Sequence, residues 1–185
     1  MYVRNYGEEV DLPWQNVFQT EDKSVVEQFC REQNIKFSWQ GERLKTYQVC
    51  QAIAVHPRTG EMVWFNQAHL FHISSLDKIT RDFLLAEYSE GGLPRNVYYG
   101  DGSSIEDSVL DEIRHCYKQE TILFPWKEGD ILMLDNMLMA HGRTPLLENV
   151  VLSLEWRNHT VYHQMIIEND VMLQPVHEWG FNPRL

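Results

Sequence analysis

The sequence predicts a mainly β fold with peripheral helices, closer to a β-sandwich or barrel with insertions than to an alternating β/α fold. Segments rich in β-branched and aromatic residues, bounded by turn residues, indicate strands. Three segments carry apolar residues at helical spacing. Neither common type of glycine-rich phosphate loop is present. The length of 185 residues allows one domain rather than two.

The strand signals fall in two groups. Residues 45–55 and 61–71 flank a turn at residues 56–60, so they predict an antiparallel pair. The apolar run at residues 131–134 is typical of a buried strand. Two further strands are expected at residues 121–126 and 150–156.

Capping residues place the three helices. The first is expected to begin near Thr20, whose hydroxyl can accept from free backbone N–H groups, and to end by Asn34. The second follows Ser75 and ends before Gly91. The third opens with residues 103–106, where a serine and a glutamate three positions later predict a capping box.

Charge and composition narrow the possible partners. The chain carries 16 Lys and Arg against 27 Asp and Glu, a net charge of −11. This balance argues against nucleic acid and anionic membranes as partners. No apolar run approaches the ~18 residues of a transmembrane helix, and the missing signal-peptide pattern favours the cytoplasm. Cys30, Cys50 and Cys116 form no disulfide or zinc motif and are expected to be buried or half-buried free thiols.

Three histidines are candidate ligands. His141 follows the apolar run and precedes a turn-like exit, a position suited to binding metal or substrate, although a hydrogen-bonded structural role also fits. His69 and His72 would share a face of a helix or point to opposite faces of a strand. A metal pair is conceivable, but this spacing alone is a weak signal.

Several sequence blocks together resemble the TauD/TfdA-like (taurine dioxygenase-like) Fe(II)/2-oxoglutarate oxygenases. The resemblance is nearest to the syringomycin-type branch, which accompanies nonribosomal peptide synthetases. The most distinctive block is HPRTGEMVWFNQAH at residues 56–69. The other blocks are residues 2–6, 12–15, 93–96, 98–102 and 129–145.

This resemblance implies a double-stranded β-helix, or jelly roll, and an iron held by two histidines and one carboxylate. It makes His141 the distal iron-ligating histidine. It also implies Fe(II) and 2-oxoglutarate as cofactors, and hydroxylation of an unactivated C–H bond with release of succinate and CO₂. The expected substrate is a small molecule or a carrier-bound amino acid, often attacked at its β-carbon, which places the protein in secondary metabolism.

Two departures from the family pattern qualify this interpretation. No histidine is followed two positions later by Asp or Glu, the family's proximal iron-binding motif, which lies upstream of the block beginning at Tyr2. We therefore expect residues 1–145 to be the C-terminal portion of an oxygenase domain, with an incomplete jelly roll completed by a missing N-terminal half or by a homo-oligomer. The family's 2-oxoglutarate-binding arginine is also displaced. Arg157 is the next candidate, and Arg143 matches a different family arginine.

Residues 146–185 form a divergent tail with only 2 basic and 5 acidic side chains. A single-nucleotide slip near Pro145 would explain both the tail and the displaced arginine, and the DNA of the gene decides this hypothesis. Two other interpretations stay open. One is a non-catalytic jelly-roll remnant that binds a partner. The other is a differently built metalloprotein using His69, His72 and His141.

Overall fold

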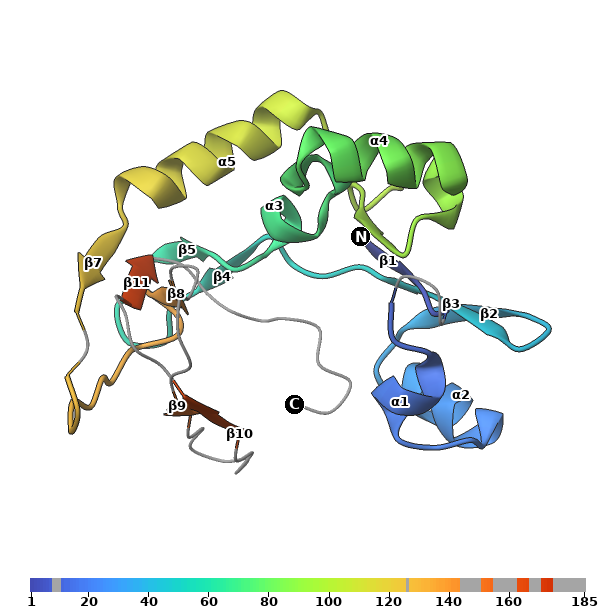
Figure 1. Cartoon of the computed structure of the whole chain (residues 1–185), viewed down its shortest axis with the longest axis horizontal. Coiled ribbons are helices and arrows are strands. Elements are labelled where there is room, and N and C mark those ends of the chain that lie inside the picture. The colour runs from blue at the N-terminus through green and yellow to red at the C-terminus, as the bar shows by residue number, and fades with distance from the viewer. Residues whose placement is uncertain (8–10, 126, 144–150, 155–162, 167–170, 175–185) are drawn as a thin grey trace. The chain divides into compact units, whose positions relative to one another are not determined.

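The computed structural model describes the chain except residues 8–10, 126, 144–150, 155–162, 167–170 and 175–185 (Figure 1). The described chain forms two compact units. The first contains residues 1–52 and 66–114, and the second contains residues 53–65 and the described residues from 115 onward. Helix α5 (Asp107–Gln119) begins in the first unit and ends in the second.

A four-stranded antiparallel sheet organises the first unit. Its strand order is β2 (Lys36–Gln40), β3 (Arg43–Gln48), β1 (Tyr2–Asn5), β6 (Arg95–Val97). Strand β1 is internal, and Val3 lies opposite Tyr47 on one side and Asn96 on the other. Gly41 has a φ of +60° in the tight connection from β2 to β3, a conformation that glycine adopts without a steric cost.

Aspartates begin two helices of this unit. Helix α2 (Lys23–Glu32) has Asp22 as its N-cap, whose carboxylate accepts from Ser24 N–H at 2.8 Å. The expectation that Thr20 caps this helix is wrong, because its hydroxyl accepts from Asp22 N–H instead. Asp77 caps α4 (Lys78–Glu87), close to the expected start after Ser75. A shorter helix, α1 (Trp14–Phe18), was not predicted.

The predicted capping box at residues 103–106 does not form. Asp101 accepts from both the backbone N–H and the hydroxyl of Ser103, at 2.9 and 2.7 Å, so this serine closes a turn before the helix. Helix α5 begins later, at Asp107. Three short helical turns complete the unit: α3 (Ala68–Phe71), η1 (Ile73–Ser75) and η2 (Glu90–Gly92).

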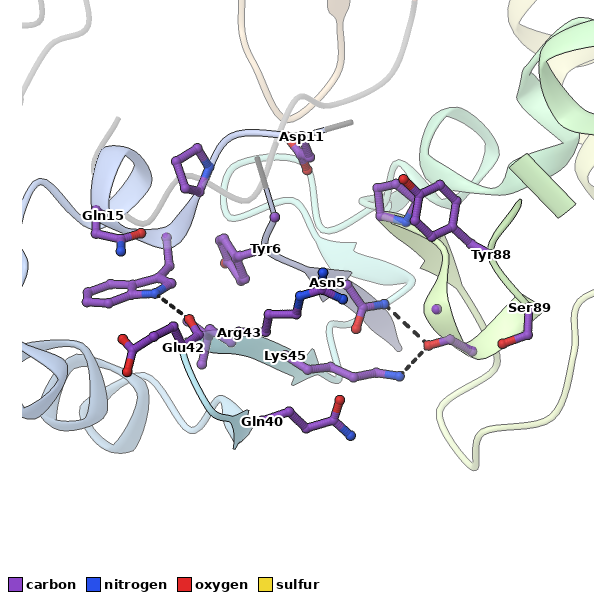
Figure 2. Close-up of a pocket in the computed structure, with 17 residues that line it drawn as sticks. Asn5, Tyr6, Asp11, Gln15, Gln40, Glu42, Arg43, Lys45, Tyr88 and Ser89 are labelled. Carbon is purple, nitrogen blue, oxygen red and sulfur yellow. Dashed lines mark hydrogen bonds between the residues drawn. The ribbon is translucent and has the colours of Figure 1, made fainter. Parts of the chain in front are cut away.

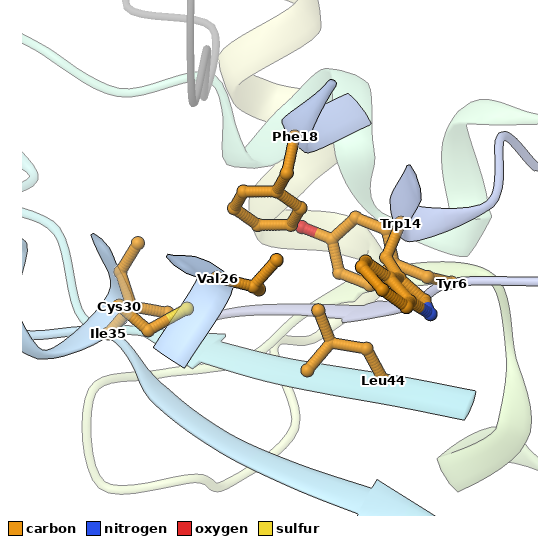
Figure 3. Close-up of a cluster of buried hydrophobic side chains, with 7 residues drawn as sticks. All are labelled: Tyr6, Trp14, Phe18, Val26, Cys30, Ile35 and Leu44. Carbon is orange, nitrogen blue, oxygen red and sulfur yellow. The ribbon is translucent and has the colours of Figure 1, made fainter. Parts of the chain in front are cut away.

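Helices α1 and α2 bury a common apolar cluster against β3 (Figure 3). Its members are Tyr6, Trp14, Phe18, Val26, Cys30, Ile35 and Leu44. The indole N–H of Trp14 donates to the Glu42 carbonyl at 2.9 Å, which satisfies its polar end. The expectation of buried or half-buried thiols is confirmed for Cys30, which is buried, and for Cys50, which is half-buried, and it is wrong for Cys116, which is exposed.

The second unit contains the predicted hairpin in shortened form, because residues 45–48 of the expected first strand belong to β3 instead. Strands β4 (Ile53–Val55) and β5 (Met62–Trp64) pair antiparallel, with Ile53 opposite Trp64. The turn at residues 56–60 is confirmed by a hydrogen bond from Gly60 N–H to the His56 carbonyl at 2.9 Å. The expected strand at residues 61–71 ends early because Asn66 Oδ1 accepts from Ala68 N–H and starts α3.

Two other antiparallel sheets belong to this unit. Strands β7 (Ile122–Phe124), β11 (Val171–Gln174) and β8 (Ala140–Arg143) form one, with β11 in the middle. Strands β9 (Val151–Leu154) and β10 (His163–Ile166) form the other. Strands β7 and β9 confirm the expectations for residues 121–126 and 150–156.

The predicted buried strand at residues 131–134 is wrong. Within the described chain these residues pair with no strand, and Ile131 and Met133 are 93% and 92% exposed. An apolar run by itself records only hydrophobicity, and burial needs a facing surface that the described residues do not provide here.

Antiparallel sheets with helices beside them agree with the mainly β class expected from the sequence. The jelly roll is the family's fold, and it stays an expectation for this chain. Among the described residues, no helix is both long and apolar enough to cross a membrane.

Neighbouring valines on α2 allow a matched test of the core. Val26 is 0% exposed within the apolar cluster, whereas Val25 is 46% exposed. We expect Val26→Ala to lower the free energy of unfolding by about 2 kcal/mol, because it leaves a cavity. Val25→Ala should change it by less than about 0.5 kcal/mol. Denaturant unfolding of the full chain measures both values, and equal effects would contradict this packing.

Candidate functional site

His141 lies on β8, in the second unit. Its backbone pairs with β11, where Leu173 stands opposite it, and its side chain is half-buried. Directly before β8, the Asp135 carbonyl accepts from the N–H groups of Leu138 and Met139, each at 2.9 Å. A hydrogen-bonded turn at residues 135–139 therefore directly precedes β8, the strand that contains His141.

His56 is a polar residue of this unit whose importance the sequence reasoning missed. It is 3% exposed, and its Nε2 lies 3.1 Å from Asp135 Oδ2. Its Nδ1 accepts from Thr59 N–H at 3.0 Å. The ring nitrogen that accepts from an amide carries no proton, so Nε2 carries the proton and donates to the carboxylate. The expected turn at residues 56–60 could have drawn attention to His56, but its partner is 79 positions away.

His69 and His72 lie in the first unit and serve local structure. His69 is buried on α3, which supports the helical alternative for this pair, and His72 ends that helix. His72 Nδ1 accepts from Ser74 N–H at 3.1 Å and begins η1. Arg114 donates to the His69 carbonyl and to Ser74 Oγ, at 2.6 and 2.8 Å. This network uses the pair as turn-forming residues.

Burial and a nearby cation keep His69 neutral. Removal from water disfavours the imidazolium, and the positive charge of Arg114 adds to this effect, so the pKa of His69 falls to about 4. Burial likewise lowers the pKa of His72, although Asp107 opposes the shift. Neutral imidazoles are the forms that bind metals, but Nδ1 of His72 is already engaged by Ser74.

The described residues do not by themselves make an iron site. Among them, no three His, Cys, Asp or Glu side chains gather so as to hold a metal. His141 therefore stands as a single candidate ligand, and the metalloprotein that would combine it with His69 and His72 gains no support. Arg157, the candidate for 2-oxoglutarate, lies outside the described residues.

A cavity of about 570 Å³ opens in the first unit between the sheet, the chain before α1 and the segment around η2 (Figure 2). On one side, Asn5 and Lys45 donate to the Gly91 carbonyl at 3.3 and 2.5 Å. On another, Asp11 accepts from Arg95 through two nitrogens, each at 2.7 Å, and from Arg4 Nε at 3.1 Å. These bonds close the cavity wall.

Asp11 is a buried anion held by two cations. Burial would raise its pKa, but the hydrogen bonds from Arg95 and the charge of Arg4 outweigh burial, so the pKa lies below its usual range. The carboxylate is thus saturated by arginines of this chain, and it acts as a structural tie between β1 and β6.

Comparison with known proteins defines the class to which this fold and site belong. The family model of the taurine catabolism dioxygenase TauD, TfdA family matches residues 2–152. The chain therefore belongs to the TauD/TfdA family of 2-oxoglutarate-dependent dioxygenases, and the resemblance based on the sequence blocks is confirmed. The match continues past Pro145, while the proposed division at residues 145 and 146 stays a prediction.

Two relatives give this family assignment more detail. The chain is 43% identical over 145 residues to the dapdiamide synthesis protein DdaC from Enterobacter agglomerans, covering 78% of this chain and 44% of that protein. It is 27% identical over 154 residues to a clavaminate synthase-like protein from Arabidopsis thaliana, covering 78% of this chain and 43% of that protein. The chain thus spans less than half the length of each relative.

The lowered pKa of His69 predicts an acid-sensitive fold. The unfolded chain takes up a proton at His69 below about pH 6.5, whereas the folded chain resists protonation until about pH 4. The free energy of unfolding should therefore decrease as the pH falls through this window, by at most about 3 kcal/mol from this residue. Denaturant unfolding of the full chain at several pH values measures the slope.

A substitution separates this contribution from the other titrating groups. His69→Gln cannot take up the proton, so its free energy of unfolding should depend less steeply on pH than that of the wild type, whatever its stability at neutral pH. His115→Gln, at an exposed position of α5, is the matched control and should keep the wild-type slope. An unchanged slope in His69→Gln would show that His69 is not held neutral by the fold.

Proposed function

We propose that this chain is part of an Fe(II)/2-oxoglutarate-dependent oxygenase that hydroxylates an unactivated C–H bond and releases succinate and CO₂. The observation that carries the proposal is the family match over residues 2–152, which includes the strand bearing His141. The relative named for dapdiamide synthesis supports a small-molecule or carrier-bound amino-acid substrate, in which the β-carbon is the proposed position of attack.

In this proposal His141 is the distal iron ligand and Arg157 binds the carboxylate of 2-oxoglutarate. A neutral imidazole on a strand is a suitable first-row metal ligand, and a guanidinium suits a carboxylate because it forms two parallel hydrogen bonds. The remaining ligands are proposed to come from another polypeptide segment or a second copy. One imidazole holds iron weakly against water and buffer, so the 185 residues alone should show little activity.

A second candidate function is a non-catalytic module that binds the rest of an oxygenase domain. Exposed apolar side chains of the second unit favour it. Val55 and Met62 lie on the β4–β5 hairpin, and Ile131 and Met133 lie before β8, all largely exposed. Exposed apolar groups on a strand pair favour association with another polypeptide.

Metal binding tests the role of His141 without requiring turnover. We expect anaerobic titration of Fe(II) against a chromophoric chelator to show weak binding by the full chain. His141→Ala should weaken this binding at least about ten-fold, since a direct ligand is lost. His115→Ala is the control, because this exposed histidine of α5 has no proposed role in the site.

Two results would count against the proposal in different ways. Equal Fe(II) binding by wild type and His141→Ala would remove His141 from the metal site. Succinate release from 2-oxoglutarate at the rate of a complete family enzyme, by these 185 residues alone, would show that the chain supplies a full site. In that case the need for another segment would be wrong, while the family reaction would stand.

A further inference from the structure

Asp135 connects two parts of the second unit through both of its carboxylate oxygens. Oδ2 lies 3.1 Å from Nε2 of His56, in the turn of the β4–β5 hairpin. Oδ1 accepts from Met137 N–H at 2.9 Å, in the turn that leads into β8. One side chain thus ties the hairpin to the segment immediately before the strand of His141.

The hairpin determines which nitrogen of His56 faces this carboxylate. Thr59 N–H donates to Nδ1 at 3.0 Å, and the Thr59 hydroxyl lies 3.1 Å from the same atom. The proton of the neutral ring is therefore on Nε2 and points to Asp135. His56 is nearly fully buried, whereas the Asp135 side chain is 40% exposed, so the imidazole is shielded from water while the carboxylate stays in contact with it.

A carboxylate is the chemical group that this position requires. Two donors converge on Asp135, the imidazole N–H and the Met137 amide, and each meets its own oxygen. An asparagine of the same shape offers one acceptor oxygen and one NH₂ donor. It can satisfy either donor, but it turns its own N–H groups toward the other. The backbone carbonyl of Asp135 meanwhile holds Leu138 and Met139.

We propose that His56 and Asp135 are positioning residues, which fix the turn at residues 135–139 and through it the start of β8 and the side chain of His141. The importance of His141 rests on the proposed function. The coupling itself rests on the hydrogen bonds of this unit and requires no bound metal. A simpler role, in which the pair only closes the hairpin turn, predicts no effect at β8.

Nuclear magnetic resonance of the metal-free full chain tests the coupling. We expect Asp135→Asn to speed amide hydrogen exchange at Met137, Leu138 and Met139 by about ten-fold or more, since one charge-assisted hydrogen bond is lost. The ring signals of His141, assigned by their absence in His141→Gln, should shift as well.

Asp130→Asn is the matched control for that experiment. Asp130 Oδ2 accepts from Lys127 N–H at 2.9 Å in the preceding turn, and one acceptor is enough there. The control should therefore leave exchange at residues 137–139 and the His141 signals at their wild-type values.

Substitutions of His56 give an independent readout if Asp135→Asn fails to fold. His56→Gln keeps an N–H donor toward Asp135 and should preserve slow exchange at residues 137–139. His56→Leu removes the donor and should reproduce the effect of Asp135→Asn. Exchange within about two-fold of wild type in both Asp135→Asn and His56→Leu, with unshifted His141 signals, would overturn the proposal. A failure of Fe(II) binding alone would contradict the iron-ligand role and leave the coupling intact.

Discussion

The hydrogen bonds of β1 to strands on both of its sides hold the first unit together. This strand of four residues pairs with β3 along its length and with β6 along most of it. The pairing continues past the strand, since Asn5 N–H donates to the Pro94 carbonyl and Tyr6 N–H to the Leu44 carbonyl, at 2.8 and 2.9 Å. Strand β1 thereby joins β3 to β6, two strands that lie far apart in the sequence. The ion pairs of Asp11 with Arg4 on β1 and Arg95 on β6 strengthen the same junction.

Short acidic and amide side chains form the same local hydrogen bond at several places in both units. Asp22 and Asp77 begin helices, Asn66 begins α3, and Asp135 closes the turn before β8, in each case by accepting from a backbone N–H two positions ahead. The short side chain reaches this amide without straining the chain. Asp135 differs because its second oxygen also accepts from His56, in the turn of the β4–β5 hairpin. The turn before β8 is therefore bonded to another part of the second unit.

Local patterns predicted the local parts of this structure. The β4–β5 hairpin, the turn at residues 56–60 and helix α4 follow from spacing, turn residues and caps in nearby sequence. The strand expected at residues 131–134 failed because an apolar run says nothing about a facing surface. The His56–Asp135 contact was beyond local reasoning, since its partners are 79 positions apart and only folding brings them together.

In the candidate site, too, nearby sequence indicated individual residues but not the contacts between distant ones. The family blocks singled out His141, but the sequence alone gave no way to see what holds its strand. Likewise, the spacing of His69 and His72 left helix and strand open, and the Asn66 side chain decides for the helix by accepting from Ala68 N–H.

The three thiols differ in ways that make them natural reporters of the fold. Cys30 is buried in the apolar cluster, and burial raises its pKa to about 11, whereas Cys116 is exposed on α5. Because the thiolate is the reactive form, a thiol-modifying reagent at neutral pH meets Cys116 in the folded chain and Cys30 only after the first unit opens. The rate of labelling at Cys30 therefore records opening of that unit in the unaltered protein.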